Sequence, residues 1–204
     1  GEVFLIRETG KIKAADKPFG SVLAYTFPPR YPAGFEKRVL KEALKKAAAS
    51  LGFDWGFFMV DYILNRGIPV FIEMTPRPGG DSIPEMMRAA TGLDPLGLYL
   101  DFVQGDFKAP KEIPLAPETF ASLNFYAPKE GKIEIINGSK VTACSHVRKL
   151  FFKKQQGDRV ILPPKDYDNR LLGYCVIEAK PGLDLAAETR RLQALIDLRI
   201  KENA

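Results

Sequence analysis

The fold is decided by the stretch DYILNRGIPVFIEMTPRPGGD, residues 61–81. Two apolar runs rich in strand-forming residues, 55–64 and 68–75, stand on either side of the tripeptide Asn65-Arg66-Gly67. An Asn-containing, Gly-ended turn between two such runs is typical of a β-hairpin. The stretch therefore predicts two antiparallel strands joined by a short loop.

Each of the two runs carries one acid, Asp61 in the first and Glu73 in the second. With a loop over residues 65–69, Leu64 pairs with Val70 and the two acids lie directly opposite each other on one face. Like charges in that position destabilise a sheet, whereas a divalent cation between them reverses the sign of the interaction. Mg²⁺ binds one or two carboxylates together with substrate phosphates, so the pair predicts a magnesium site.

The residues after the second strand add features suited to an anion. Arg77 can hold a phosphate through a two-pronged contact, and the glycines of Pro78-Gly79-Gly80 let the backbone approach a ligand closely. Ser82 and Glu85 fit a capping box at the start of a helix, whose N-terminus favours negative charge. The simpler alternative is an ordinary hairpin with two surface acids, but the combination of features favours a binding site.

At these residues the chain resembles the ATP-grasp superfamily. The C-terminal nucleotide subdomain of that superfamily has an acid on one strand and a Glu-x-Asn-x-Arg-like motif on the next, matched here by Asp61 and by Glu73-Met74-Thr75-Pro76-Arg77. Segment 85–94, EMMRAATGLD, is similar to a helix of the biotin carboxylase and carbamoyl-phosphate synthase branch. Gly79-Gly80-Asp81 looks closer to amino-acid ligase-like and carbamoyl-phosphate-synthase-like members. Thr75 replaces the usual Asn, and its hydroxyl is a poorer match for magnesium than a carbonyl oxygen.

The resemblance implies ATP and Mg²⁺ as cofactors and assigns a role to each motif residue. Asp61 and Glu73 would bind the nucleotide through the metal, with Thr75 as a weaker third metal ligand. Arg77 would be the catalytic residue that stabilises the transferring phosphoryl group. The substrate contacts would come from Gly79, Gly80 and Asp81.

The implied fold class is α+β, with an antiparallel sheet packed by helices as the ATP-grasp C-terminal subdomain and a small β-rich C-terminal lobe with a closing helix. We expect the subdomain over residues 1–107, a proline-rich linker over 108–118 and the lobe over 119–204. Helical spacing predicts helices at 34–51 and 183–200. Further strands are expected at 2–8, 21–27, 120–127, 132–136, 147–153, 160–162 and 173–178, with a hairpin turn at Asn137-Gly138.

The implied reaction is that of a carboxylate–amine ligase acting through an acyl phosphate, with small-molecule carboxylate (or bicarbonate) and amine substrates. Nothing in the sequence matches the N-terminal lobes of the superfamily, so we expect a missing N-terminal half or a partner subunit, without which the chain is inactive. The alternative is a non-catalytic, ATP-grasp-derived nucleotide-binding or regulatory subunit, which the Thr75 departure favours. The possibility of a homo-oligomer stays open.

Composition limits the other classes of function. The 204 residues, 46% of them hydrophobic, are enough for a sizeable core, and no apolar run is long enough to span a membrane. The net charge of +5 suits polyanions. However, no nucleic-acid motif accompanies it, so we read most lysines as solvated and expect no nucleic-acid partner. Arg7, Lys11, Lys13 and Arg30 are candidates for contact with an anionic substrate.

The cysteines and the single histidine give no separate site. Cys144 and Cys175 lack metal-binding spacing, which favours two buried thiols in a reduced, cytoplasmic compartment. His146 cannot complete a zinc site alone. Beside Arg148 it either contacts substrate or is an ordinary surface histidine, and we favour the second reading.

Overall fold

The computed structural model describes residues 2–14, 21–110, 113 and 118–202. The described residues form two compact units, one within 1–8 and 29–115 and the other within 9–28 and 116–204. The domain limits expected from sequence stay a prediction; they are 1–107, 108–118 and 119–204. Most of the expected linker lies outside the described residues.

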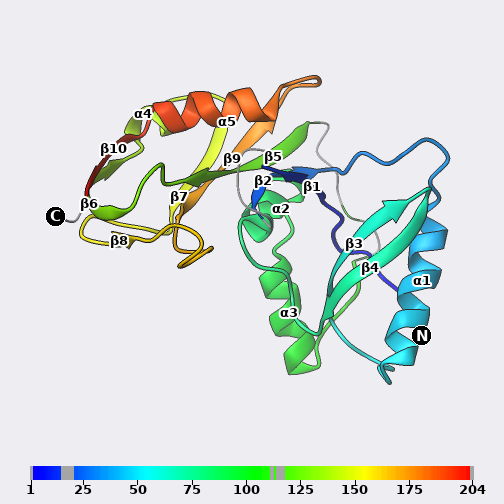
Figure 1. Cartoon of the computed structure of the whole chain (residues 1–204). Helices are drawn as coiled ribbons and strands as arrows, with labels where there is room; N and C mark the ends of the chain where they lie inside the picture. Colours follow the sequence, from blue (N-terminus) through cyan, green and yellow to red (C-terminus); the bar gives the residue numbers. More distant parts are fainter. Residues whose placement is uncertain (1, 15–20, 111–112, 114–117, 203–204) are drawn as a thin grey trace. The chain divides into compact units, whose positions relative to one another are not determined.

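The first unit holds the hairpin that organises the sequence. Strands β3 (Met59–Asn65) and β4 (Ile68–Thr75) form a two-stranded sheet. Helix α1 (Lys37–Ser50) packs against β4, as Figure 1 shows, and its Leu40 is only 1% exposed. Helices α2 (Ile83–Thr91) and α3 (Pro95–Gln104) follow and contact each other.

Local sequence signals set the ends of these helices. Gly92 and Gly105, both with left-handed backbone, end α2 and α3, as expected for glycine after a helix. The carboxylate of Asp94 accepts a hydrogen bond from the amide of Leu96 and caps α3. Ser82 does stand at the start of α2, but its hydroxyl makes no capping hydrogen bond, so the capping box expected there was wrong.

The hairpin has the expected register at the acids and a different turn. Asp61 pairs with Glu73, as predicted. Leu64, however, pairs with Pro69 rather than Val70, because the loop is a tight two-residue turn. A β-bulge opposite Asp61 and Tyr62 leaves Ile72 as the extra residue of β4. The one-residue error in the turn and the one-residue bulge cancel at the acid pair.

The second unit is built on a five-stranded sheet in which every neighbouring pair is antiparallel. Its order is β1 (Gly10–Lys13), β2 (Val22–Phe27), β5 (Thr119–Tyr126), β9 (Leu171–Ala179) and β7 (Val147–Phe152). A three-stranded sheet has the order β10 (Asp197–Lys201), β6 (Gly131–Asn137) and β8 (Arg159–Val160). The helices of this unit are α4 (Ser139–Thr142) and α5 (Leu185–Ala194) (Figure 1).

One hydrophobic core fills this second unit. Ala121, Leu123 and Phe125 of β5 contribute to it at alternate positions, as a strand with one face toward a core must. Leu192 of α5 is fully buried in the same cluster. Residues from both sheets and from α5 therefore share one core.

The expected α+β class, with antiparallel sheets packed by helices, is confirmed. Three local expectations were wrong. Residues 2–8 form no strand, and the first strand is instead β1. Asn137-Gly138 precedes α4 rather than turning a hairpin. The closing helix expected over 183–200 stops at Ala194, and β10 follows it because it pairs with β6.

Candidate nucleotide and metal site

The acid pair lies on one face of the β3–β4 hairpin. Directly opposed residues of an antiparallel pair point to the same side, so Asp61 and Glu73 share a face. Thr75, two positions along β4, lies on that face too, and its Oγ1 donates a hydrogen bond of 2.6 Å to Oε1 of Glu73. Glu73 is exposed, whereas Asp61 and Thr75 are half-buried. The structure thus brings together the three predicted metal ligands.

The opposite face of the hairpin is held by a polar network around Tyr31. Tyr62 of β3 contacts the ring of Phe71 edge-on, and its hydroxyl lies 3.5 Å from that of Tyr31. Tyr31 donates a hydrogen bond to Glu8, which also accepts one of 2.6 Å from Lys37. Burial, together with the bond to Glu8, raises the pKa of Tyr31 above its ordinary value, so its hydroxyl stays a donor. Sequence reasoning missed this network because it joins distant segments.

The turn after β4 carries the remaining predicted residues. Arg77 is exposed, and its Nη1 donates to the carbonyl of Pro78 at 3.0 Å. Gly79 is buried, and a Cβ there would overlap the guanidinium of Arg7. Asp81 has a left-handed backbone, with φ of 55°. The missing Cβ of Gly79 thus lets the guanidinium of Arg7 lie close to the backbone, whereas from sequence we expected a ligand there.

The donor set fits an open magnesium site rather than a closed one. Among the residues that the structure describes, no group of three or more His, Cys, Asp or Glu side chains could hold a metal ion. Two carboxylates and a hydroxyl leave half of an octahedral shell to water and phosphate oxygens, as Mg²⁺ prefers. Asp61, Glu73 and Thr75 are therefore the residues that would hold it.

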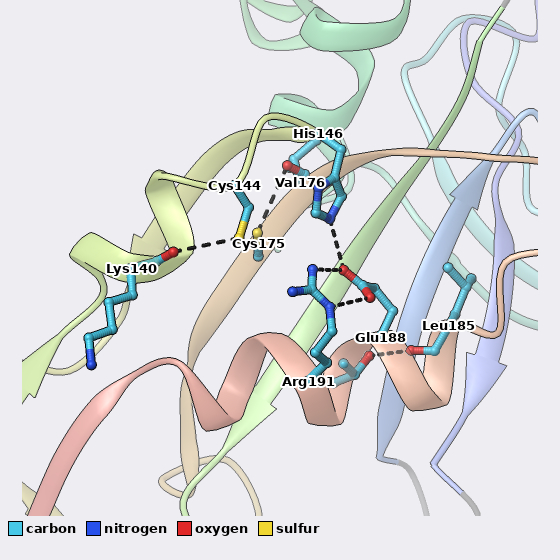
Figure 2. Close-up of polar contacts among 9 residues, drawn as sticks. Lys140, Cys144, His146, Cys175, Val176, Leu185, Glu188 and Arg191 are labelled. Carbon is cyan, nitrogen blue, oxygen red and sulfur yellow. Dashed lines mark hydrogen bonds and ion pairs between the residues drawn. The ribbon is translucent and has the colours of Figure 1, made fainter.

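The single histidine belongs to a separate cluster in the second unit, shown in Figure 2. Nε2 of His146 lies 2.8 Å from Oε1 of Glu188, and Arg191 donates two hydrogen bonds to the same carboxylate, at 2.7 and 2.9 Å. The cysteines are both free thiols; Cys175 is fully buried, and Cys144 is only half-buried, which corrects the expectation that both are buried. Since His146 is satisfied by Glu188, the cluster reads as structural. The three-residue spacing of Glu188 and Arg191 was its only sequence signal.

Comparison with known proteins extends the fold assignment. No family model matches the sequence, and no curated protein matches it. The structure is similar to phosphoribosylglycinamide synthetase from Anaerococcus prevotii, with a TM-score of 0.71 at 16% identity. It is similar to L-amino acid ligase from Bacillus licheniformis, with a TM-score of 0.73 at 19% identity. For biotin carboxylase from Campylobacter jejuni, solved as a beta-gamma-ATP complex, the TM-score is 0.64 at 19% identity.

These matches cover 95%, 95% and 91% of this chain and 49%, 48% and 41% of the respective matched chains. The chain thus has the fold of ATP-grasp enzymes, and it spans about half the length of the proteins it matches. Among the described residues, every helix is too short or too polar to cross a bilayer.

Proposed function

We propose that this chain is the C-terminal part of an ATP- and Mg²⁺-dependent ligase that joins a carboxylate, or bicarbonate, to an amine through an acyl phosphate. The observation that carries the proposal is the register that sets Asp61 opposite Glu73. Solved structures of ligases and of a biotin carboxylase share the fold over nearly the whole chain, which supports the reaction class. Cytoplasmic location is part of the proposal.

In this proposal the protein acts by positioning and by charge neutralisation, which phosphoryl transfer chiefly requires. Mg²⁺, when bound, would neutralise charge on the ATP phosphates. Asp61 and Glu73 would hold it, with Thr75, whose hydroxyl donates to Glu73, as a weaker third ligand. Arg77 donates hydrogen bonds to the transferring phosphoryl group. Substrates are oriented by the backbone of Gly79 and Gly80 and by the carboxylate of Asp81.

We further propose that an N-terminal ATP-grasp half, on the same chain or a partner subunit, covers the acid-bearing face. Ile63, Ile68 and Val70 lie on that face and are 53%, 64% and 43% exposed. Ile72, at the bulge, is 69% exposed. An apolar group of this kind is typical of a surface that another element covers. The half-length match to the solved enzymes favours the other half of the fold as that element.

The test is phosphate release by a protein that carries both halves, supplied with ATP, Mg²⁺ and a panel of carboxylates and amines. We expect E73Q and D61N each to raise the Mg²⁺ concentration for half-maximal activity at least tenfold, because each removes one charged ligand. Asp106, an exposed acid outside the hairpin, provides the control D106N, which is expected to behave as wild type. An unchanged Mg²⁺ dependence in both hairpin variants, with the fold intact by circular dichroism, would contradict the proposal.

One observation favours a second candidate, a non-catalytic nucleotide-binding or regulatory subunit. Thr75 stands where the superfamily motif has Asn, and its hydroxyl is engaged with Glu73. Equilibrium binding of MgATP without phosphate release under any substrate pair would support this candidate. If T75N then restored turnover, the threonine would be identified as the cause of the lost activity.

A further inference from the structure

Arg170, in the second unit, is a buried charged side chain that pairs with no carboxylate of the described residues. It immediately precedes β9 and is only 5% exposed. Its Nε donates to the carbonyl of Tyr167 at 3.2 Å and its Nη2 donates to the hydroxyl of Ser21. The guanidinium carbon lies 5.0 Å from the ring centre of Tyr126. Each of these described partners of Arg170 is electrically neutral.

Four other arginines of the described chain have a carboxylate partner although they are far more exposed. Arg38, Arg88, Arg148 and Arg191 each pair with a carboxylate, although their side chains are 69%, 37%, 46% and 51% exposed. Burying a charge costs free energy unless an opposite charge or several hydrogen bonds compensate it. The most buried of these guanidinium groups is thus the one that lacks a carboxylate among the described residues.

The loop that carries Arg170 is held in place by its own hydrogen bonds. Oδ1 of Asp166 accepts bonds of 2.9 Å from the amides of Asp168 and Asn169. Oδ1 of Asn169 in turn accepts a bond of 2.9 Å from the amide of Ile161. The guanidinium is therefore positioned in advance, which lowers the entropy cost of binding a ligand there.

A row of polar side chains follows β5 on the side away from the core. Ser122, Asn124 and Tyr126 alternate with the core residues of the strand, so they share the other face. Among the described residues, Ser122 Oγ is fully buried and has no hydrogen-bond partner. Asn124 donates to the carbonyl of Val22 at 2.9 Å. Tyr126, at the end of the row, is the residue whose ring contacts Arg170.

We propose that Arg170 anchors a binding subsite for the oxyanion group of a small molecule, a carboxylate or a phosphate, beside Tyr126 and Ser21. The planar guanidinium matches both groups through two parallel hydrogen bonds. Nη1 of Arg170 makes no hydrogen bond to a described residue. It is also not one of the described side-chain atoms that are fully buried and unpaired. Nη1 is therefore available as a donor. The subsite does not use the acid pair of the first unit. Its test is therefore independent of the test of the proposed ligase activity.

The experiment compares R170M with wild type and with R190M, which changes an exposed arginine of the same unit. Thermal unfolding is followed while inorganic phosphate and acetate are titrated in separate arms, against sodium chloride of matched ionic strength. At ten times its dissociation constant, an anion should raise the midpoint of wild type and R190M by about 3–5 °C. R170M should show no such rise. The arm that responds at lower concentration identifies the group.

The stability without added anion is a second readout. Methionine replaces a buried charge that lacks a carboxylate partner among the described residues with an apolar chain, so R170M should keep or raise the midpoint. A purely structural arginine predicts a fall. R170K, which keeps the charge but not the two-pronged donor, should show less than half of the wild-type rise. The proposal is overturned by an equal rise in R170M or R170K, by a midpoint fall in R170M, or by no response of wild type to either anion.

Discussion

Glu188 is a buried carboxylate of the second unit on which two basic side chains converge. Its side chain is 9% exposed and accepts hydrogen bonds from Arg191 and His146 (Figure 2). The bonds from Arg191, and then that from His146, hold the pKa of Glu188 below its ordinary value of 4.5, against the opposing effect of burial. Because the carboxylate is stabilised in the folded state, its protonation must weaken folding.

The direction of the pKa shift sets the pH window. A folded pKa below the unfolded one gives stability that is fully present above pH 4.5 and is lost as the pH falls through the folded pKa. At pH 7, we expect E188Q to be less stable than wild type by about 1–2 kcal/mol. This is the contribution of a hydrogen bond to a charged group, reduced because Arg191 is half-exposed and its charge is screened by solvent. The difference should shrink as the pH falls from 7 to 3, because the carboxylate loses charge as its folded pKa is approached. Urea unfolding at both pH values measures it.

The exposed pair of Glu202 and Lys129 supplies the control for this measurement. E202Q should change the free energy of unfolding by less than about 0.5 kcal/mol at either pH, because surface ion pairs contribute little. A difference between E188Q and wild type that stays constant from neutral to acid pH would show that the carboxylate charge is not what matters.

At the scale of elements, the β3–β4 hairpin is held in register by its turn and its bulge. Arg66 and Gly67 have φ of 52° and 81°, the left-handed pair that a tight two-residue hairpin turn requires. The bulge at Ile72 then shifts the pairing by one residue before the acids. Moving either feature alone would place Glu73 on the opposite face from Asp61.

Replacement of Gly67 tests the turn. Alanine at this position is free of steric overlap, so any effect comes from the left-handed backbone alone. We expect G67A to lower the free energy of unfolding by about 1–2 kcal/mol in urea titrations. G80A is the matched control: its position is also open but lacks a left-handed φ, so its stability should hold or rise by up to about 1 kcal/mol. Equal effects of the two variants would refute this account of the turn.

The hairpin also shows how far sequence carries the fold. Alternation along each run predicted which residues share a face of a strand, because that signal is local and repeats every second residue. The pairing of Asp61 with Glu73 was predicted correctly because the error in the turn and the bulge cancel. The bulge could not be foreseen, since Ile72 is as typical of a regular strand as its neighbours. The helix predicted over residues 195–200 was wrong because a contact with a distant segment overrides the local signal. The apolar spacing of these residues suits a helix, but they pair with β6 as a strand. Contacts between distant segments, such as Arg7 with Gly79, leave no local pattern at all.

At the scale of the whole molecule, the buried hydrophobic residues are divided unevenly between the two units. Every residue of the large buried cluster belongs to the second unit, which contains Leu192 at 0% exposure. The first unit has the smaller buried set, with Leu40 of α1 at 1% exposure. A chain with separate compact units need not unfold in one transition, and the candidate metal hairpin lies in the unit with less buried apolar surface.

Two leucine replacements test this division. L192A and L40A each leave a cavity and should cost about 2–5 kcal/mol locally. If the units unfold separately, L192A speeds amide hydrogen exchange in β5 and β9 while β3 and β4 exchange as in wild type, and L40A does the reverse. Mass spectrometry of peptides from the four strands reads both variants in one experiment. Equal acceleration of all four strands by either variant would mean that the chain unfolds as a single cooperative unit. The stability of the acid pair would then depend on the second core.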